Sequence, residues 1–327
     1  MNEGKELLYI SQAEVCQLGM PLKQVLDLVE ESYSEKAKGY LQNSPKAIIP
    51  VAPGCNSYAM PALMQSTDYF GMNWQSCFNA NLKTSLVPTS GVIGLYRKPT
   101  GIQIAIVEDS YIDAWCRGAM AGLCARYLAN TASKTIAIIG CGYWAKYYLL
   151  GILLALPSLE NVLIYDDQRA RCEVWLTEMK EEAPGLNYKT TALRDAVAQA
   201  DILITADVLQ QGLAEKGEIE AGWLKKGCLV VSANQDQQFI KGVINQDVDT
   251  LVTDDLPQYI EKKDAFVKDI AATPLDLLDY VTGKAKRQNT EETIFCCLLG
   301  MSVCNTMVAY DIFLRALDQN LGQAMAL

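Results

Sequence analysis

The chain has 327 residues, of which 50% are hydrophobic and 20% charged, so about two domains with sizeable cores are expected. Its 28 basic and 38 acidic residues give a net charge of −10, which argues against nucleic acid or an anionic membrane as a partner. The absence of histidine excludes Ser-His, Cys-His and His-metal chemistry.

Proton transfer must therefore use Asp, Glu, Lys, Tyr, Cys or water. The 11 cysteines show no CxxC spacing, so we expect reduced thiols and no metal site. The first residues, MNEGKELLYISQ, do not resemble a signal peptide, and no run of about 18 apolar residues predicts a membrane span. We therefore expect a cytoplasmic protein.

The N-terminal part begins with a predicted helix over residues 11–40, where Ser11 and Glu14 form a capping-box pair. Short strand-like runs broken by Pro and Gly fill residues 44–108, which predicts an antiparallel sheet or a small barrel. Residues 110–129 are expected to form a helix with small residues on one face.

From residue 134 the pattern changes to alternating strands and helices, typical of a doubly wound parallel sheet. Strands are predicted at 135–139, 162–165, 201–205, 228–232 and 249–253, with helices at 144–155, 168–182 and 191–199. Residues 256–290 are expected to be mostly helical, and 291–318 to form one long buried helix.

These patterns predict an α/β fold with a Rossmann doubly wound parallel sheet. We expect the dinucleotide-binding domain to span residues 131–290. It would be inserted in a second α+β domain made of residues 1–130 and 291–327.

A glycine-rich turn follows the strand at 135–139, and an apolar helix begins directly after it. Gly140 would make the tight turn, Gly142 would let a pyrophosphate approach the backbone, and Ala145 would let the helix lie close to the strand. The positive end of that helix favours a phosphate. Tyr143 and Trp144 would pack over the cofactor, or Trp144 would instead be buried in the start of the helix.

Asp166 directly follows the next predicted strand, the place of the acidic residue that binds the adenosine ribose. A carboxylate there accepts hydrogen bonds from the ribose hydroxyls and repels a 2′-phosphate, so we expect NAD rather than NADP. Arg169 and Arg171 leave NADP open, because either could bind a 2′-phosphate. Further cofactor contacts are expected from residues near predicted strand ends: Thr89, Thr205, Ala206 and Ser232.

Several motifs in a fixed order resemble the ornithine cyclodeaminase/mu-crystallin family over most of the chain. GMNWQSCFNAN resembles the family stretch G-x-K-W-x-S-x-F-P-x-N, and ADILITA its A-D-I-V-x-T-A strand. The other matching pieces are Met60-Pro61-Ala62, Pro88-Thr89, Thr100-Gly101 and the C-terminal GMSVCN.

The resemblance implies a homodimer built through the non-Rossmann domain, with a small amino or imino acid bound between the domains. It also implies nicotinamide chemistry at a C–N bond: amino acid oxidation, imine reduction or cyclodeamination. The protein would orient substrate and cofactor and manage one proton and one carboxylate.

Some residues that the resemblance places in the site differ from the family pattern. Asn73 stands at the family's lysine, which helps hold the substrate carboxylate, and Lys46 at an arginine that also pairs with it. Cys116 stands at an arginine of the helix, and Arg117 follows one residue later. Arg117 would reach cofactor phosphates only if the helix register slips.

The family's proton-handling aspartate aligns with Asn234, and Asp236 lies two residues further on. The C-terminal aspartate of the family is Asn305 here. Two interpretations remain open: an active enzyme in which Lys46, Asp236 or water handles the proton, or a nicotinamide- or small-molecule-binding sensor or carrier without turnover. A structural dimer without a substrate is a third. The sequence leaves the substrate and the direction of reaction undetermined.

Overall fold

The structure is a computed structural model that describes residues 4–53, 55–78, 81, 86–206, 219–233, 240–266 and 272–327. Two compact units divide the chain: residues 1–116 together with 301–327, and residues 117–300. The second unit is thus one continuous segment between the two parts of the first.

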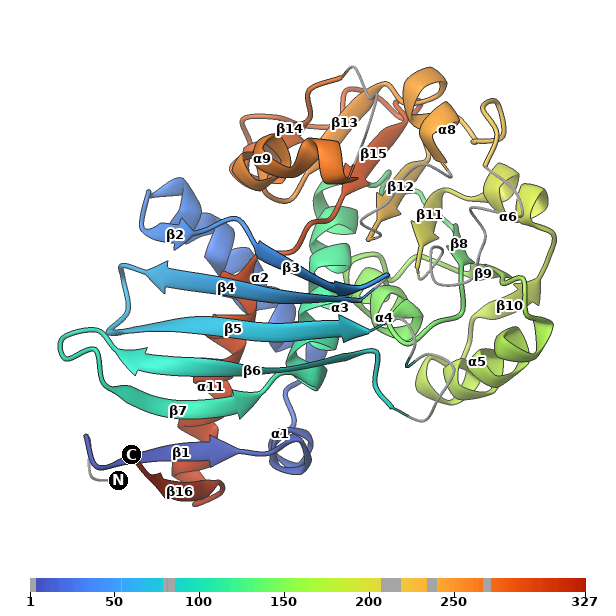
Figure 1. Ribbon diagram of the computed structural model, residues 1–327. Helices are drawn as coiled ribbons and strands as arrows, with labels where there is room; N and C mark the ends of the chain where they lie inside the picture. The colour runs from blue at the N-terminus through green and yellow to red at the C-terminus, as the bar shows by residue number, and fades with distance from the viewer. Residues whose placement is uncertain are drawn as a thin grey trace. The chain divides into compact units, whose positions relative to one another are not determined.

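The first unit is built on an eight-stranded sheet in the order β16-β1-β7-β6-β5-β4-β2, with β3 paired to β4 (Figure 1). Neighbouring strands are antiparallel except β1 and β7, which are parallel. The sheet is therefore open, and the barrel alternative is wrong. The strands are β1 (Glu6–Ile10), β2 (Leu41–Asn43), β3 (Ala47–Ala52), β4 (Cys55–Met64), β5 (Tyr69–Phe78), β6 (Thr89–Arg97), β7 (Gln103–Glu108) and β16 (Gln323–Ala326).

Helix α11 (Ser302–Asp318) packs against β4, β5 and β6 and contacts α2 (Leu22–Ala37). The predicted first helix is two helices, since α1 (Gln12–Leu18) ends at Gly19 with φ of +52° and Pro21 precedes α2. The predicted capping box of Ser11 and Glu14 is confirmed at the start of α1. The apolar face of α11 thus forms the core together with one face of the sheet.

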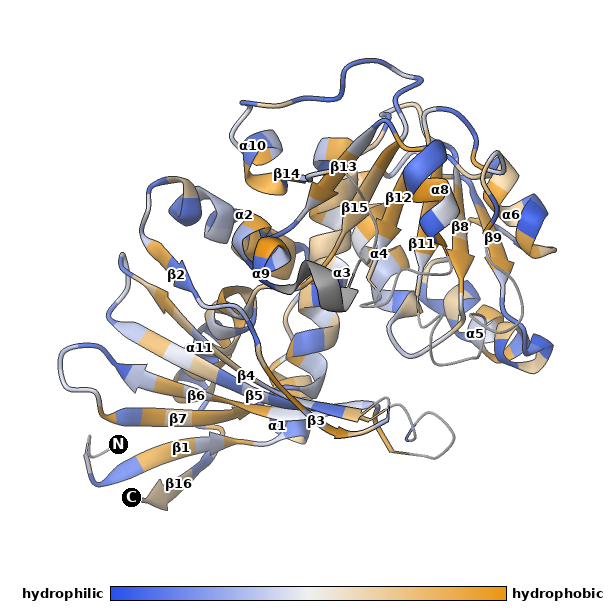
Figure 2. Ribbon diagram, turned by 45° about the horizontal axis from the view of Figure 1, so that its top comes forward, coloured by the Kyte–Doolittle hydropathy of each residue, from blue (hydrophilic) through white to orange (hydrophobic). Residues whose placement is uncertain are grey.

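The second unit contains a parallel sheet in the order β10-β9-β8-β11-β12-β15-β13-β14, which confirms the predicted doubly wound fold. Every residue of β11, β12 and β15 is buried, and Figure 2 shows these strands as largely hydrophobic. The strands are β8 (Thr135–Ile139), β9 (Asn161–Tyr165), β10 (Asn187–Thr190), β11 (Ile202–Thr205), β12 (Leu229–Ser232), β13 (Thr250–Thr253), β14 (Leu275–Asp276) and β15 (Ile294–Cys297).

The helices of this unit follow the predicted alternation. They are α4 (Ala145–Ala155), α5 (Arg169–Glu182), α6 (Leu193–Gln199), α8 (Lys241–Gln246), α9 (Leu256–Phe266) and α10 (Leu277–Val281). Helix α3 (Ser110–Leu128) spans the boundary between the units, which falls after Cys116.

The predicted helix over residues 291–318 is wrong in its first part. Residues 294–297 belong to β15, which pairs with β12 and β13 in the parallel sheet, and the long C-terminal helix begins only at Ser302. A short apolar run fits a buried strand and a buried helix equally well, so periodicity alone did not separate them. The compact units accordingly divide at residues 116/117 and 300/301, whereas the patterns predicted boundaries at 130/131 and 290/291.

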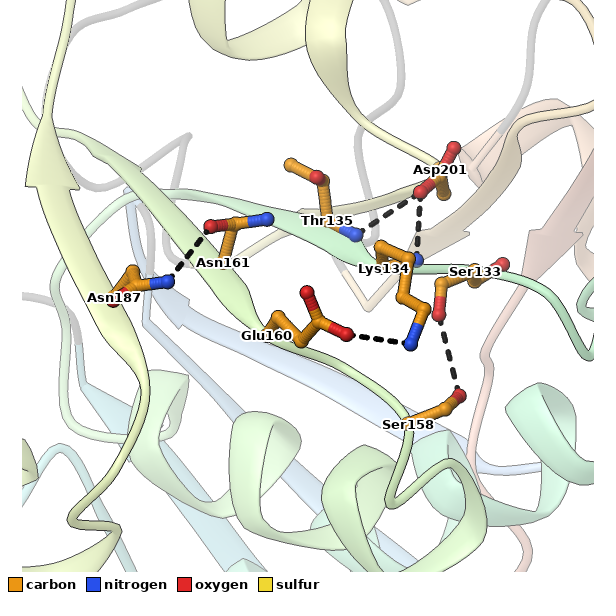
Figure 3. A network of polar contacts seen from close by, with 8 residues as sticks. All are labelled: Ser133, Lys134, Thr135, Ser158, Glu160, Asn161, Asn187 and Asp201. Carbon is orange, nitrogen blue, oxygen red and sulfur yellow. Dashed lines mark hydrogen bonds and ion pairs between the residues drawn. The ribbon is translucent and has the colours of Figure 1, made fainter.

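Polar side chains fix the amino ends of neighbouring strands in the second sheet (Figure 3). Asp201 Oδ2, before β11, accepts the backbone N–H groups of Lys134 and Thr135 at 2.8 and 3.0 Å. Lys134 Nζ lies 2.6 Å from Glu160 Oε1, just before β9. These contacts hold the strands in register at the edge opposite to their carboxyl ends.

Helices α3 and α4 pack backbone to backbone. A Cβ atom on Gly151 of α4 would lie 1.8 Å from the carbonyl oxygen of Gly118, and one on Gly118 would lie 2.4 Å from the carbonyl oxygen of Tyr147. Real Cβ atoms essentially never approach this closely, so both positions require glycine. The crossing sets the position of α4 and of the turn that precedes it.

We expect Gly151→Ala to lower the free energy of unfolding by about 1–3 kcal/mol or more, because the added methyl group forces the two helix backbones apart. The matched control is Gly242→Ala in α8, where the nearest heavy atom lies 4.0 Å from the new Cβ. Alanine should be neutral or stabilising there. Urea unfolding compares the two variants, and equal stabilities would contradict the close-packing argument.

Candidate functional site

The parallel sheet reverses its winding direction at β8. The chain passes from β8 to β9 and β10 on one side, and then to β11 and β12 on the other. In doubly wound folds, ligands bind outside the carboxyl ends of the strands at this switch point. Thr205, Ala206 and the glycine-rich turn all lie there, because β8 and β11 are direct neighbours.

The turn after β8 has the geometry that a phosphate-binding loop needs. Gly140 has φ of +97°, which side chains with a Cβ rarely adopt, and its N–H donates to the carbonyl oxygen of Tyr165 at 2.8 Å. Helix α4 begins at Ala145, and the side chain of its N-cap residue, Trp144, makes no capping hydrogen bond. The N–H groups of the first turn and the helix dipole favour an anion at this end.

Trp144 adds a further donor to the start of α4. Its indole N–H is buried and has no hydrogen-bond partner among the described residues. The guanidinium of Arg117 lies 4.8 Å from the centre of the Trp144 ring, and Tyr143 makes an edge contact with the same ring at 5.8 Å. A positive charge and a buried donor at an uncapped helix start fit a pyrophosphate.

Arg117 reaches this position without a register slip, because α3 is continuous from Ser110 to Leu128. Contact between Arg117 and cofactor phosphates stays a prediction. Cys116, at the position of the family arginine, is buried at 6% exposure. The close crossing of α3 and α4 at Gly118 brings the neighbouring Arg117 to the start of α4.

The carboxylate of Asp166 is anchored beside the glycine-rich turn. It accepts the N–H of Cys141 on Oδ2 and that of Gln168 on Oδ1, both at 2.8 Å. Burial raises its pKa, while these N–H groups and Arg171 oppose the shift. Arg171 Nε lies 3.9 Å from Oδ2. The remaining lone pairs of a carboxylate held in this way can accept ribose hydroxyls.

Arg169 is exposed and lies 3.5 Å from Glu173, so of the two arginines only Arg171 contacts Asp166 among the described residues. At the neighbouring strand ends, the hydroxyl of Thr205 donates to Ser232 Oγ at 3.0 Å, and both side chains are buried. The N–H of Ala206 donates to the carbonyl oxygen of Ile139 at 2.9 Å.

A second polar cluster lies in the first unit, around a carboxylate that the sequence patterns did not single out. Asp109 follows β7 directly, and its Oδ2 accepts Asn73 Nδ2 at 2.9 Å and Gln75 Nε2 at 2.8 Å. Its Oδ1 accepts Asn305 Nδ2 from α11 at 3.1 Å. Asn73 and Gln75 share a face of β5 because side chains alternate along a strand, and Trp74 between them is exposed. This set, Asn73, Gln75, Asp109 and Asn305, is called the amide cluster below.

The amide cluster is almost entirely closed to solvent. Asp109 and Asn73 have 0% exposure, Gln75 3% and Asn305 8%. Burial, with a smaller contribution from the charge of Asp113, raises the pKa of the Asp109 carboxyl to about 8, although the three amides oppose the shift. Asn73 Oδ1 is buried and has no hydrogen-bond partner among the described residues.

The other predicted site residues lie in different places. Thr89 begins β6, and its buried hydroxyl has no partner within the described part of the chain. Lys46 precedes β3, and its Nζ lies 5.7 Å from the centre of the Tyr58 ring. Asn234 and Asp236 lie outside the described residues.

Asp109 and Gln75 are the site candidates that sequence reasoning missed. The sequence signal for Asp109 was its place between a strand and a helix. An acidic residue at such a junction is more often a helix cap than a site residue. Over the described ranges, no group of three or more Cys, Asp or Glu residues is placed to hold a metal ion. In the same ranges no helix is long and apolar enough to cross a membrane.

Comparison with known proteins decides the family. The family model of the ornithine cyclodeaminase/mu-crystallin family matches residues 8–320. The chain belongs to this family. This result confirms the resemblance drawn from the motifs.

Relatives at low identity cover the whole chain. The Staphylococcus aureus N-((2S)-2-amino-2-carboxyethyl)-L-glutamate dehydrogenase is 26% identical over 99% of both chains. The structure of Thermococcus litoralis Δ1-pyrroline-2-carboxylate reductase with NADH and L-proline superposes with a TM-score of 0.83 at 24% identity, covering 97% of this chain and 99% of that one. The structure of an archaeal alanine dehydrogenase dimer with bound NAD superposes with a TM-score of 0.80 at 22% identity, covering 98% of this chain and 99% of that one.

The buried carboxyl of Asp109 predicts a pH dependence of stability. Its folded-state pKa of about 8 lies above the ordinary value of 3.8, so the folded protein holds a proton that the unfolded chain releases. The stability contributed by this proton is complete below about pH 4 and is lost as the pH rises to about 8.

As the pH rises from about 4 to about 8, we expect the free energy of unfolding of wild type to fall relative to that of Asp109→Asn. The change should be at most about 1.4 kcal/mol per pH unit. Urea unfolding at several pH values measures it. A difference that stays constant with pH would show that Asp109 does not titrate in this range.

Proposed function

We propose that the protein is an NAD(H)-dependent oxidoreductase that acts at a C–N bond of a small amino or imino acid. The observation that carries the proposal is the uncapped, glycine-rich start of α4 at the switch point, with the carboxylate of Asp166 anchored beside it. This arrangement fits a pyrophosphate and an adenosine ribose without a 2′-phosphate.

The family supports the type of reaction. Relatives that cover most of the chain are named as an N-((2S)-2-amino-2-carboxyethyl)-L-glutamate dehydrogenase, an alanine dehydrogenase and a Δ1-pyrroline-2-carboxylate reductase. Each of these names refers to a compound in which a carbon atom bears an amino or imino nitrogen. Imine reduction, amino acid oxidation and cyclodeamination all remain within this class.

We assign the following roles as part of the proposal. When bound, the nicotinamide supplies or accepts the hydride at the carbon next to nitrogen. Lys46 would bind the substrate carboxylate, and Asn73 would contact the substrate near the reacting carbon. Asp236 or a water beside Asn234 would handle the proton.

The cofactor would be held mainly by the second unit. Arg117, Trp144 and the backbone of Gly142 to Ala145 would bind the pyrophosphate, and Asp166 the ribose. Tyr143 would pack over the cofactor. Thr205, Ala206 and Ser232 would line the strand ends near it, and Thr89 would contact it from the first unit.

A second candidate function is binding without turnover, as a sensor or carrier. It is favoured by the neutral side chains of Asn73 and Cys116 at positions where the family resemblance places charged site residues. Dinucleotide binding alone does not separate the two functions. A turnover assay does.

We further propose that the partner is a second copy of the chain and that the protein works in the cytoplasm. One relative of known structure is named as a dimer. The sulfur atoms of Cys124 and Cys296 lie 3.5 Å apart without a bond, and those of Cys141 and Cys172 lie 3.6 Å apart, which suits a reducing compartment.

Asp166→Ala tests the ribose assignment. We expect NADH binding to weaken by about tenfold or more, since a hydrogen bond to a charged group is lost. NADPH binding should weaken less or improve, because the repulsion of the 2′-phosphate is removed. Fluorescence titration of the reduced cofactors measures both affinities. Glu173→Ala removes an exposed charge from α5 and should change neither, and tighter binding of NADPH than NADH to wild type would refute the assignment.

The proposed function itself is tested by NADH binding followed by turnover. The panel of candidate substrates comprises small cyclic imines, 2-oxo acids with amines, and amino acids. Turnover of each is measured by the change in absorbance of the reduced nicotinamide. Turnover on any member would establish the enzyme. Tight NADH binding without turnover across the panel would favour the sensor or carrier, and no binding of NADH or NADPH would refute both functions.

A further inference from the structure

The amide cluster presents two buried acceptors and no positive charge. The carboxylate of Asp109 accepts three amide N–H groups but makes no ion pair with a basic side chain among the described residues. Asn73 Oδ1, with 0% exposure, has no donor in the same ranges. A buried acceptor without a donor is unfavourable, and a buried carboxylate without a cation keeps its proton up to the raised pKa of about 8 unless a cation replaces that proton.

The group that completes the cluster must be a hydrogen-bond donor, since Asn73 Oδ1 lacks one. Without a ligand, the proton held at the pKa of about 8 neutralises the Asp109 carboxylate. A neutral hydroxyl would satisfy Asn73 Oδ1 but leave that proton in place. A protonated nitrogen can donate to Asn73 Oδ1 and also replace the proton as the positive charge beside Asp109.

We propose that Asn73 and Asp109 bind the positively charged nitrogen of the substrate, a protonated amine or iminium, whose N–H donates to Asn73 Oδ1. This inference rests on the proposed function and names the part of the substrate that the cluster recognises. The family resemblance places a lysine at position 73, where the protein supplies the cation and the ligand the anion. Here the protein supplies the anion and the ligand the cation.

The surroundings of Asp109 bear on how binding depends on pH. Strand β5 and helix α11 face it with neutral amides, and α3 with the like charge of Asp113. Further charged side chains of the packed elements are Glu108 at the end of β7 and Arg97 at the far end of β6, which pairs with Asp68. Helix α3 also carries Arg117 and Arg126. Helix α11 carries Asp311 and Arg315, which pair with each other, and Asp318 at its end.

Cation binding requires the ionised form of Asp109, so a proton must leave when the ligand binds below the pKa of about 8. The affinity for a nitrogen-bearing ligand should rise by up to about tenfold per pH unit below that value and level off above it. The rise should vanish in Asp109→Asn. In Asp113→Asn it should persist with its midpoint at lower pH, because the repelling charge is gone.

The test compares ligands that differ only in the nitrogen: L-proline with cyclopentanecarboxylate, and L-alanine with propanoate. Calorimetric titration uses the full chain saturated with NADH. We expect wild type to prefer the nitrogen-bearing member of a pair by about tenfold or more. Asp109→Asn and Asn73→Leu should lose this preference while still binding NADH.

A second pair of variants tests the site without an external ligand. Asn73→Lys brings an ammonium group into the cluster, and Asn73→Met brings a side chain of similar length without charge. We expect the lysine variant to have the higher Tm, and the difference to disappear when each change is combined with Asp109→Asn.

The outcomes separate the inference from the proposed function. Failure to bind NADH would refute the proposed function. If NADH binds, equal affinity for both members of every pair would overturn the inference. If no member of either pair binds, the lysine and methionine variants decide: an Asn73→Lys protein no more stable than Asn73→Met would overturn it.

Discussion

The contact of α3 with α4 at Gly118 and Gly151 is the constraint on which the candidate cofactor site depends. Two helix backbones approach until only hydrogen atoms fit between them. This fixes the start of α4, and with it the glycine-rich turn, against the helix that carries Arg117. Arg117, one residue after the position where the family resemblance places an arginine, therefore lies against the start of α4.

The second organising feature is a change in where charge is placed. Four positions that the family resemblance describes as charged, 73, 116, 234 and 305, carry neutral side chains. Two of them, Asn73 and Asn305, donate to one buried carboxylate, Asp109. These two neutral side chains thus belong to one hydrogen-bonded group. They surround a carboxylate whose pKa burial raises to about 8.

The amide cluster bears on the choice between enzyme and binding protein. Asn73 and Asn305 both donate to the carboxylate of Asp109, so the neutral side chains at these two positions have a shared structural partner. Relatives that cover most of the chain are named as dehydrogenases and reductases. We therefore favour the proposed enzyme over a binding protein without turnover.

The sequence by itself determined the doubly wound sheet, the turn from Gly140 to Ala145 and the place of Asp166, since each depends on residues close together in the chain. Apolar runs followed by Gly or Asp mark the strand ends of β8 and β9 locally, and the observed strands agree to within a residue. The tertiary structure decided what depends on distant residues. The insertion of β15 between β12 and β13 is one case, because four apolar residues fit a strand or a helix equally well until neighbouring strands pair with them. The amide cluster is the other, since Asn305 and Asp109 are 196 positions apart and only the packing of α11 on the sheet brings them together.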